Sequence, residues 1–191
     1  MKKTYSILLN GVGGQGIILA SDIICLAAMY DGFDAKKSEI HGMSQRGGSV
    51  FSHIRFGEKV YSPVIAKRSA DIIVSLEEVE ILRWIDYASP EVKMIVLKNR
   101  IQPVNSESYP ETIEAFIKSK FKNSLFIVPE ELAEGINRKC INTAVLGIVS
   151  KYLDLSEKSW MDALADSVPK RTVEINQEAF EKGRKYEESG A

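Results

Sequence analysis

Residues 4–29 read TYSILLNGVGGQGIILASDIICLAAM, and this stretch decides the fold. An apolar strand around residues 5–9 leads into a glycine-rich turn over residues 10–16, and an apolar helix begins near Gln15. Glycine is needed in such a turn because a residue without Cβ adopts positive φ and lets other groups approach the backbone closely. The order strand, glycine turn, helix predicts an α/β domain.

The glycine turn has several possible roles. Its amides and the positive end of the helix dipole favour an anion, and three of its glycines match the dinucleotide-binding fingerprint. That fingerprint also requires an acidic residue closing the second strand about 20 residues on. Here Asp34 falls at the start of the expected strand 33–40, and Glu39 is followed at once by a polar run. Helix packing, an anion site, a partner-docking site and a nucleotide site all stay open. The candidate contacts are Gly11, Gly13, Gly14, Gln15 and Gly16.

The polar run forms a second glycine-rich loop, which we expect beside the first at the carboxyl ends of the strands, where ligands of open α/β sheets gather. The guanidinium of Arg46 and the neighbouring amides of this loop could jointly hold a carboxylate or a phosphate. A bracing or interface role for Arg46 is equally open. The candidate residues of this substrate or partner loop are His41, Gly42, Met43, Ser44, Gln45, Arg46, Gly47, Gly48 and Ser49.

Composition excludes several classes of protein. A chain of 191 residues with 45% hydrophobic and 27% charged residues is expected to form one domain, residues 1–191. A net charge of −1 gives no general attraction to nucleic acid or to an anionic membrane. The longest apolar run, residues 17–29, contains Asp22 and is too short to cross a bilayer. Because no signal-type segment opens the sequence, we expect a cytoplasmic protein.

The remaining pattern predicts a three-layer α/β/α sandwich with a mixed, mostly parallel sheet and a helical C-terminal third. Uniformly apolar strands at 72–76, 94–97 and 125–128 alternate with helices expected at 77–88 and from Pro110, which indicates parallel strands covered on both faces. Residues 50–56 and 59–64, separated by Gly57 and Glu58, predict an antiparallel hairpin with Pro63 at an edge. A long or broken helix over 132–153 precedes one capped by Ser156 and a last one after Thr172.

Few residues suggest catalysis by this chain alone. His53 lies within an expected strand, where a packed or hydrogen-bonded role is the simplest interpretation. The pairs at 77–78 and 130–131 are interpreted as carboxylates that complement helix dipoles. Cys25 and Cys140 lie in no C-x-x-C or Cys/His cluster, so neither a zinc site nor a disulfide framework is indicated. We assign no catalytic residue and no metal ligand.

Five motifs follow one another along the chain: GVGGQG at 11–16, EIHGMSQRGGSV at 39–50, SP at 62–63, AD at 70–71 and NTAVLG at 142–147. Together they resemble the γ-type subunits of 2-oxoacid:ferredoxin oxidoreductases. Within that group, SHIRFGEKVYSPVI at 52–65 and EINQEAFEKG at 174–183 are most similar to the small subunits of indolepyruvate ferredoxin oxidoreductases. The resemblance spans nearly the whole chain, with the motifs in the same order.

The resemblance implies a CoA-dependent oxidative decarboxylation of a 2-oxo acid, with electrons passed to ferredoxin. Thiamine diphosphate, Mg and iron–sulfur clusters would lie on larger partner subunits, in keeping with the absence here of a G-D-G motif and of cluster-type cysteine spacing. Arg46, with Gln45 and the amides of 11–16, would then contact the partner or an anionic substrate, CoA being the expected anion. An independent nucleotide-binding protein and a non-catalytic binding module are the alternatives.

Overall fold

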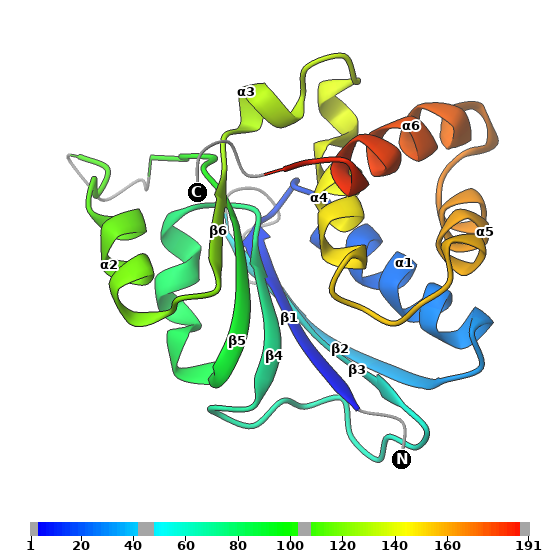
Figure 1. Ribbon diagram of the computed structural model, residues 1–191, viewed down its shortest axis with the longest axis horizontal. Coiled ribbons are helices and arrows are strands. Elements are labelled where there is room, and N and C mark those ends of the chain that lie inside the picture. The colour runs from blue at the N-terminus through cyan, green and yellow to red at the C-terminus, as the bar shows by residue number, and fades with distance from the viewer. Residues whose placement is uncertain (1–3, 42–47, 103–107, 188–191) are drawn as a thin grey trace.

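The computed structural model describes residues 4–41, 48–102 and 108–187; for His41 it describes the backbone alone. At its centre is a six-stranded sheet in the order β2-β3-β1-β4-β5-β6 (Figure 1). Its strands are β1 (Tyr5–Val12), β2 (Asp34–His41), β3 (Ser49–Gly57), β4 (Ala70–Ser75), β5 (Ala88–Leu97) and β6 (Ser124–Ile127).

The sheet is mixed, as predicted. The strand β1 pairs in parallel with β4, β4 with β5, and β5 with β6, whereas β3 runs antiparallel to both β1 and β2. The parallel strands are buried almost throughout because side chains cover both of their faces. Because β1, β4, β5 and β6 run in the same direction, all four end at one edge of the sheet, which we call the carboxyl edge. The strand β2, on the far side of β3, runs in that direction too.

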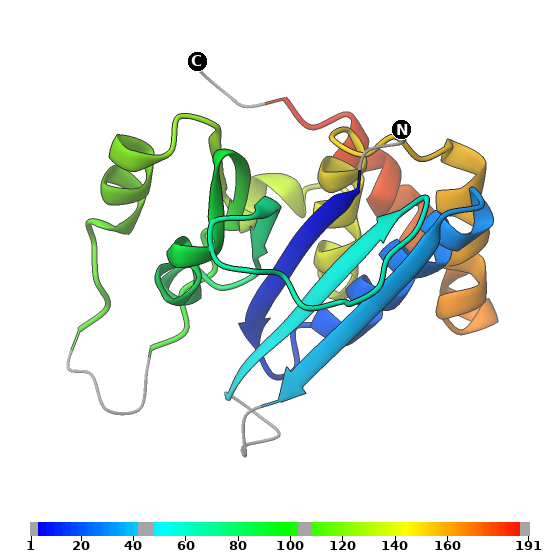
Figure 2. The same cartoon turned by 90° about the horizontal axis from the view of Figure 1, so that it is seen from below.

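The predicted hairpin between residues 50–56 and 59–64 is wrong. The antiparallel partners of β3 are β2 and β1, and residues 58–69 form no strand. Figure 2 shows this segment crossing the sheet on the face opposite α1 (Ile17–Tyr30). Side chains hold it in place of a ladder: Arg55 Nη1 donates to the Ser62 carbonyl at 3.0 Å, and His53 Nδ1 accepts from the Ile65 amide at 3.0 Å.

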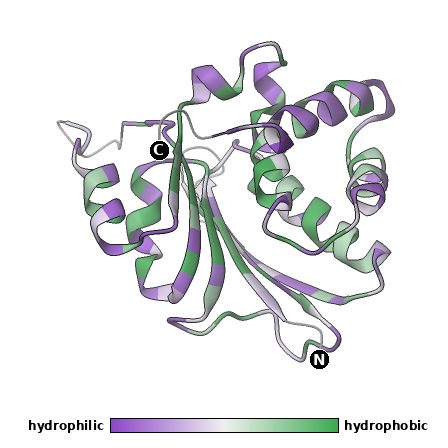
Figure 3. Ribbon diagram, viewed as in Figure 1, coloured by the Kyte–Doolittle hydropathy of each residue, from purple (hydrophilic) through white to green (hydrophobic). Residues whose placement is uncertain are grey.

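Helices cover both faces and complete the three predicted layers. On one face α1, α4 (Ile141–Ser150), α5 (Glu157–Ser167) and α6 (Val173–Arg184) enclose the larger apolar core. The other face carries α2 (Ile113–Lys120) and the short 3-10 helices η1 (Val79–Arg83) and η2 (Ile85–Tyr87) over a second core. The apolar colouring of Figure 3 follows α1, α4 and most of the parallel strands, whereas β2, α5 and α6 are more hydrophilic.

The expected α-helix over 77–88 is wrong, because η1 and η2 occupy this segment. The carboxylate of Glu77 turns back to accept the Glu80 amide at 2.9 Å, and the Glu78 amide donates to the Asn99 carbonyl at 3.0 Å. Trp84, with φ −116°, separates the two short helices. Bonds to a neighbouring segment thus replace the regular ladder that an α-helix would have formed.

The C-terminal third is helical, as predicted, and of the two forms expected for residues 132–153, one long helix or a broken one, the structure has the broken one. It consists of α3 (Pro129–Leu132), the 3-10 helix η3 (Arg138–Cys140) and α4, with a left-handed Gly135 between the first two. The predicted cap of α5 is confirmed, because Ser156 Oγ accepts the Ser159 amide at 3.1 Å. After α5 the 3-10 helix η4 (Lys170–Thr172) leads into α6.

Candidate functional site at the carboxyl edge of the sheet

The glycine turn joins β1 to α1, and its geometry is fixed by the side chain of Gln15. Gln15 Oε1 accepts the Val12 amide and Gln15 Nε2 donates to the Leu76 carbonyl, both at 2.8 Å. A Cβ at Gly11 would lie 2.5 Å from Gln15 Oε1, so this position accepts only glycine without a rearrangement. Gln15, predicted as a ligand or partner contact, therefore braces the turn against the end of β4.

Two further glycines are required by backbone conformation or by close contact. Gly14 and Gly16 have φ of +99° and +78°, in the left-handed region that side chains disfavour. A Cβ at Gly16 would also come within 2.3 Å of Asn142 Nδ2. The amino end of α4 is thus seated on the turn, which explains why GVGGQG and NTAVLG belong to one local structure.

The amides of the turn are largely used within the chain. The Gln15 amide donates to the Val12 carbonyl at 3.2 Å, and the Gly13 amide donates to the Gly48 carbonyl at 2.9 Å. With the Val12 amide bonded to Gln15, three amides that a phosphate cradle would require are already satisfied.

The two acidic residues near the ends of β2 are also engaged. Glu39 accepts from Ser21 Oγ at 3.0 Å and pairs with Lys37, while Asp34 binds Lys36 and accepts the Val60 amide at 2.9 Å. The bond from Lys36 holds the pKa of Asp34 below its ordinary value. Neither carboxylate is placed to hold a ribose, so the geometry does not support a dinucleotide site.

The second glycine-rich loop meets the first, as predicted, at the part of it that the structure describes. His41 ends β2, Gly48 accepts the Gly13 amide, and Ser49 opens β3 opposite Val12. The Ser49 hydroxyl donates to Glu80 Oε2 at 2.5 Å. Six of the candidate residues, Gly42, Met43, Ser44, Gln45, Arg46 and Gly47, lie outside the described residues.

A pocket of about 230 Å³ opens beside the first turn at the carboxyl edge. Gly14 and Gln15 form one side, Asn99 follows β5, and η3 brings Arg138 and Lys139 to the other side. Both cationic side chains are exposed, and the guanidinium of Arg138 lies 3.9 Å from the Glu130 carboxylate. The lining residues are Gly14, Gln15, Leu76, Leu97, Asn99, Arg138, Lys139, Ile141 and Asn142. Two exposed cations, one of them near Glu130, and the amide side chains of Gln15, Asn99 and Asn142 give this pocket groups that suit an anion.

Sequence reasoning missed most of this pocket. Asn99, Arg138 and Lys139 stand far from GVGGQG in the chain and meet it only in the fold. One signal was available, because Arg138 and Lys139 stand four and three positions before NTAVLG, at the start of a helical stretch, where a cation opposes the helix dipole and calls for a reason other than helix stability.

Three buried carboxylates, those of Glu77, Glu78 and Glu80, lie near the pocket. Residues 77–78 do stand at the start of a helix, as predicted, because Glu78 is the N-cap of η1 and the Glu77 carboxylate accepts the Glu80 amide of its first turn, although η1 is a short 3-10 helix. Glu78 is fully buried, and its carboxylate accepts hydrogen bonds from Nε and Nη2 of Arg100 at 2.6 and 3.3 Å. Glu77 accepts Tyr109 Oη at 2.8 Å and the Ile101 amide at 3.2 Å. Burial and this carboxylate raise the pKa of Tyr109. Glu130 and Glu131 do stand in the first turn of a helix, α3, as predicted.

These carboxylates fix the ends of the segments around the site. Glu80 anchors Ser49 at the start of β3, and Glu77 with Glu78 anchors residues 99–101 after β5. A buried charged group is retained only when it is paired or hydrogen-bonded, and each of the three carboxylates meets that condition. The carboxyl edge is therefore a rigid frame.

The cysteines do not take part in the site. Burial raises the pKa of Cys25 to about 12 and raises that of Cys140 as well, which keeps both thiols protonated at neutral pH. Over residues 4–41, 48–102 and 108–187, no group of three or more His, Cys, Asp or Glu residues has the spacing of a metal site. In the same ranges no helix combines the length and the apolar character needed to cross a membrane.

Known proteins are similar to this chain over nearly its whole length. An indolepyruvate oxidoreductase subunit, IorB of Thermococcus kodakarensis, is 35% identical over 193 residues, covering 96% of each chain. A 2-oxoglutarate synthase subunit, KorC of Methanocaldococcus jannaschii, is 32% identical and covers 96% of this chain and 94% of its own.

Solved structures show the same fold. The keto/oxoacid ferredoxin oxidoreductase γ subunit of Geobacter sulfurreducens superposes with a TM-score of 0.67 at 22% identity, covering 94% of this chain and 95% of that one. The 2-oxoglutarate:ferredoxin oxidoreductase of Magnetococcus marinus gives a TM-score of 0.74 at 20% identity, and the present chain spans 96% of itself but 31% of that protein.

The resemblance to γ-type subunits is thereby confirmed. Residues 6–186 match the family described as pyruvate ferredoxin/flavodoxin oxidoreductase, which covers the strand, the glycine turn, the carboxyl edge and the C-terminal helices in one match. The chain belongs to the pyruvate ferredoxin/flavodoxin oxidoreductase family, among the small subunits of 2-oxoacid:ferredoxin oxidoreductases.

Proposed function

We propose that this chain is the small subunit of a cytoplasmic, thiamine-diphosphate-dependent 2-oxoacid:ferredoxin oxidoreductase that acts on indolepyruvate or pyruvate. Its larger partner subunits hold the thiamine diphosphate, Mg and iron–sulfur clusters, and ferredoxin accepts the electrons through the complex. The IorB relatives support indolepyruvate, and a pyruvate/ketoisovalerate common γ subunit of Pyrococcus abyssi, 26% identical, supports pyruvate.

The observation that carries the proposal is the cationic pocket on the rigid carboxyl edge. Arg138 and Lys139 offer charge to an anion, while Asn99 and Asn142 offer amide groups, and the braced turn sets Gly14 beside them. Such a site can bind and orient a phosphorylated co-substrate without performing any bond chemistry. CoA is the proposed anion, and the Magnetococcus marinus enzyme was solved with coenzyme A and succinyl-CoA bound.

Within this function the residues of the chain have distinct tasks. Arg138 and Lys139 hold the phosphate groups of CoA, and Gln15 keeps the turn in place beneath them. Arg46 and Gln45, which lie outside the described residues, contact the catalytic partner or the anion. The thiamine cofactor, when bound on the partner, supplies the decarboxylation chemistry.

The test is a double substitution, Arg138→Gln with Lys139→Gln, in a complex reconstituted from the separately purified subunits. One charge-assisted contact is worth about 1.5–3 kcal/mol, so the apparent KM for CoA should rise roughly 10- to 150-fold. The KM for the 2-oxo acid and the extent of assembly should stay unchanged. Lys158→Gln on α5, a lysine whose side chain is 88% exposed, is the matched control. An unchanged KM for CoA in the assembled double variant would exclude the pocket as its site.

Arg46 has its own test. Arg46→Ala should weaken assembly or raise the same KM by roughly 10- to 150-fold, while the free energy of unfolding changes by less than about 0.5 kcal/mol. A large loss of stability with full activity per assembled complex would instead identify Arg46 as a brace.

An independent nucleotide-binding function is less well supported. The Val12, Gly13 and Gln15 amides are bonded within the chain, and both acidic residues of β2 are engaged. The purified chain should therefore be colourless and should co-purify with a thiamine-binding partner, whereas a bound flavin would favour the alternative.

A further inference from the structure

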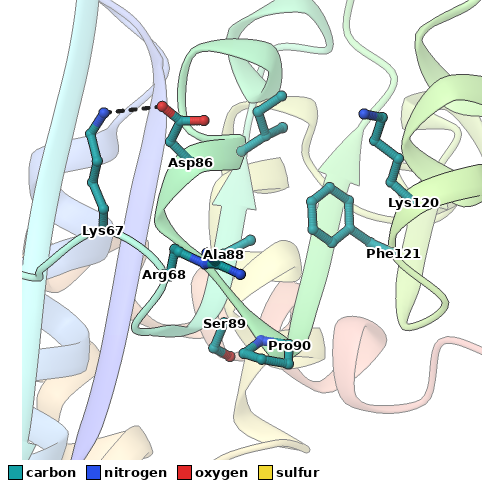
Figure 4. Close-up of a pocket in the computed structure, with 9 residues that line it drawn as sticks. Lys67, Arg68, Asp86, Ala88, Ser89, Pro90, Lys120 and Phe121 are labelled. Atoms are coloured by element: carbon teal, nitrogen blue, oxygen red, sulfur yellow. Dashed lines mark hydrogen bonds and ion pairs between the residues drawn. The ribbon is translucent and has the colours of Figure 1, made fainter.

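A second and larger pocket lies at the opposite edge of the sheet, where the parallel strands begin. It has a volume of about 570 Å³, within the usual range for sites that bind small molecules. Its walls are the loop before β4, the start of β5 and the end of α2 (Figure 4). Its lining residues are Lys67, Arg68, Ile85, Asp86, Ala88, Ser89, Pro90, Lys120 and Phe121.

The floor of this pocket is apolar. Ala88 is buried, and Ile85 and Phe121 are half-buried, both packed against the smaller core of the domain. In Figure 4 Phe121 stands across the hollow from Ala88 and Arg68. A half-buried aromatic ring open to a pocket offers a surface on which a flat apolar group gains free energy by leaving water.

The rim of the pocket is cationic. Lys67 is neutralised by Asp86, 3.1 Å away, but within the described residues neither Arg68 nor Lys120 forms an ion pair. The Lys120 ammonium lies over the Phe116 ring at 4.8 Å, a cation–π contact that attracts it but adds no negative charge. The walls therefore carry an excess of two positive charges on opposite sides.

The backbone of Arg68 supports a built site. Its φ of 63° is the one positive value among the described residues other than glycine. Asp86 maintains this conformation, since its carbonyl accepts the Arg68 amide at 2.9 Å while its carboxylate holds Lys67. In this conformation the Arg68 side chain lies along the pocket beside Ala88 (Figure 4). A β-region backbone at Arg68 would have a lower conformational energy.

We propose that this pocket binds an apolar carboxylate, an anion that carries an aromatic or comparably flat apolar group. The carboxylate lies between Arg68 and Lys120, and the apolar group rests on Phe121, Ile85 and Ala88. The site is separated from the carboxyl edge by the length of β4, six residues or about 20 Å. It is thus independent of the CoA pocket.

The test is an NMR titration of the full 21.3 kDa chain with indole-3-acetate, following backbone amides. Saturable shifts are expected at Ala88, Ser89 and Phe121. The neutral indole-3-acetamide and the small anion acetate should each bind at least about tenfold more weakly, because each lacks one half of the recognised chemistry. Arg68→Gln and Lys120→Gln should each weaken indole-3-acetate binding at least about fivefold.

The controls separate the possible sources of a signal. Lys158→Gln should bind like the unsubstituted chain, and the melting temperature of each variant verifies that it is folded. Equal binding of the acid and its amide, shifts centred on Gly14 and Asn142, or unaltered affinity in both charge variants would each overturn the proposal. So would the absence of shifts at saturating concentrations in a chain that is shown to be folded.

Discussion

Gln15 ties the glycine turn to the end of β4 by two hydrogen bonds to buried backbone groups, those of Val12 and Leu76. Gln15→Ala leaves both groups unpaired, and each such loss costs about 1–3 kcal/mol. We expect the free energy of unfolding, measured by urea denaturation, to fall by about 2–6 kcal/mol.

Gln15→Glu discriminates between bracing and ligand binding. A carboxylate can accept the Val12 amide but cannot donate to the Leu76 carbonyl, so a substantial part of the loss should remain. A change below about 0.5 kcal/mol in both variants would contradict the bracing role.

His53 makes stability depend on pH. Its ring is buried among Phe51, Trp84 and Tyr87, Nδ1 accepts the Ile65 amide, and burial lowers its pKa below the ordinary value of 6.5. The unfolded chain therefore binds a proton before the folded one does. The contribution of His53 is fully present above pH 6.5 and is lost as pH falls toward the lowered pKa of the folded state.

His53→Asn removes the titrating group while Oδ1 can still accept a hydrogen bond. Urea denaturation at several pH values should show that stability declines below pH 6.5 in the original chain, by at most about 1.4 kcal/mol per pH unit from this group. The variant, although less stable overall, should show a shallower decline. Parallel pH profiles for the two proteins would exclude His53 as the source.

The helices α4 and α6 cross so closely that two glycines are required at their contact. A Cβ at Gly147 would lie 2.0 Å from the Phe180 carbonyl oxygen, and one at Gly183 would lie 1.8 Å from that of Ala144. Thr143 Oγ1 and Asn176 Oδ1 join the same two helices by a buried hydrogen bond of 2.8 Å. The motifs NTAVLG and EINQEAFEKG are thus the two sides of one interface.

Gly147→Ala and Gly183→Ala should each destabilise the chain by about 3 kcal/mol or more, since the obstructing atoms belong to the backbone and cannot rotate away. In an unobstructed helix the same change would stabilise by about 1 kcal/mol. The measurement is urea denaturation, with the exposed Glu178→Ala on α6 as control. Near-normal stability in either glycine variant would mean that the helices can separate at little cost.

At the level of elements, the sequence predicts those whose signal is local. The strand, turn and helix of residues 4–29, the Ser156 cap and the parallel apolar strands are all decided by neighbours in the chain. The partner of β3 is not decided by neighbours in the chain. Residues 58–69 have strand-like side chains, but the side chains of Asp34, Arg55 and His53 hydrogen-bond to their backbone in place of another strand. Likewise, the segment after β4 forms η1 and η2 and not the expected α-helix, and its carboxylates bind residues distant in the chain, at 100–101.

Over the whole molecule, the two edges of the sheet separate two kinds of site. The turn at 11–16 and its contact with the second loop could be predicted because both follow from strand direction. The position of Arg138, Lys139 and Asn99 beside that turn could not, since these residues reach the pocket from segments that only the fold brings together. The cationic pocket beside Phe121 has the same origin, with Arg68 and Lys120 contributed by separate segments.

The proposed function also makes a prediction for the complete chain. Under the proposed function this subunit binds and positions a ligand, a task for which the described residues offer cations and amides at the carboxyl edge. The purified chain should fold cooperatively yet show no 2-oxo-acid-dependent reduction of a dye acceptor, with or without CoA. Activity should return when the thiamine-bearing partner is added and should saturate at a fixed ratio of the two. Turnover that co-elutes with the pure chain on gel filtration would contradict the subunit assignment, whereas turnover that elutes elsewhere would reveal a contaminating complex.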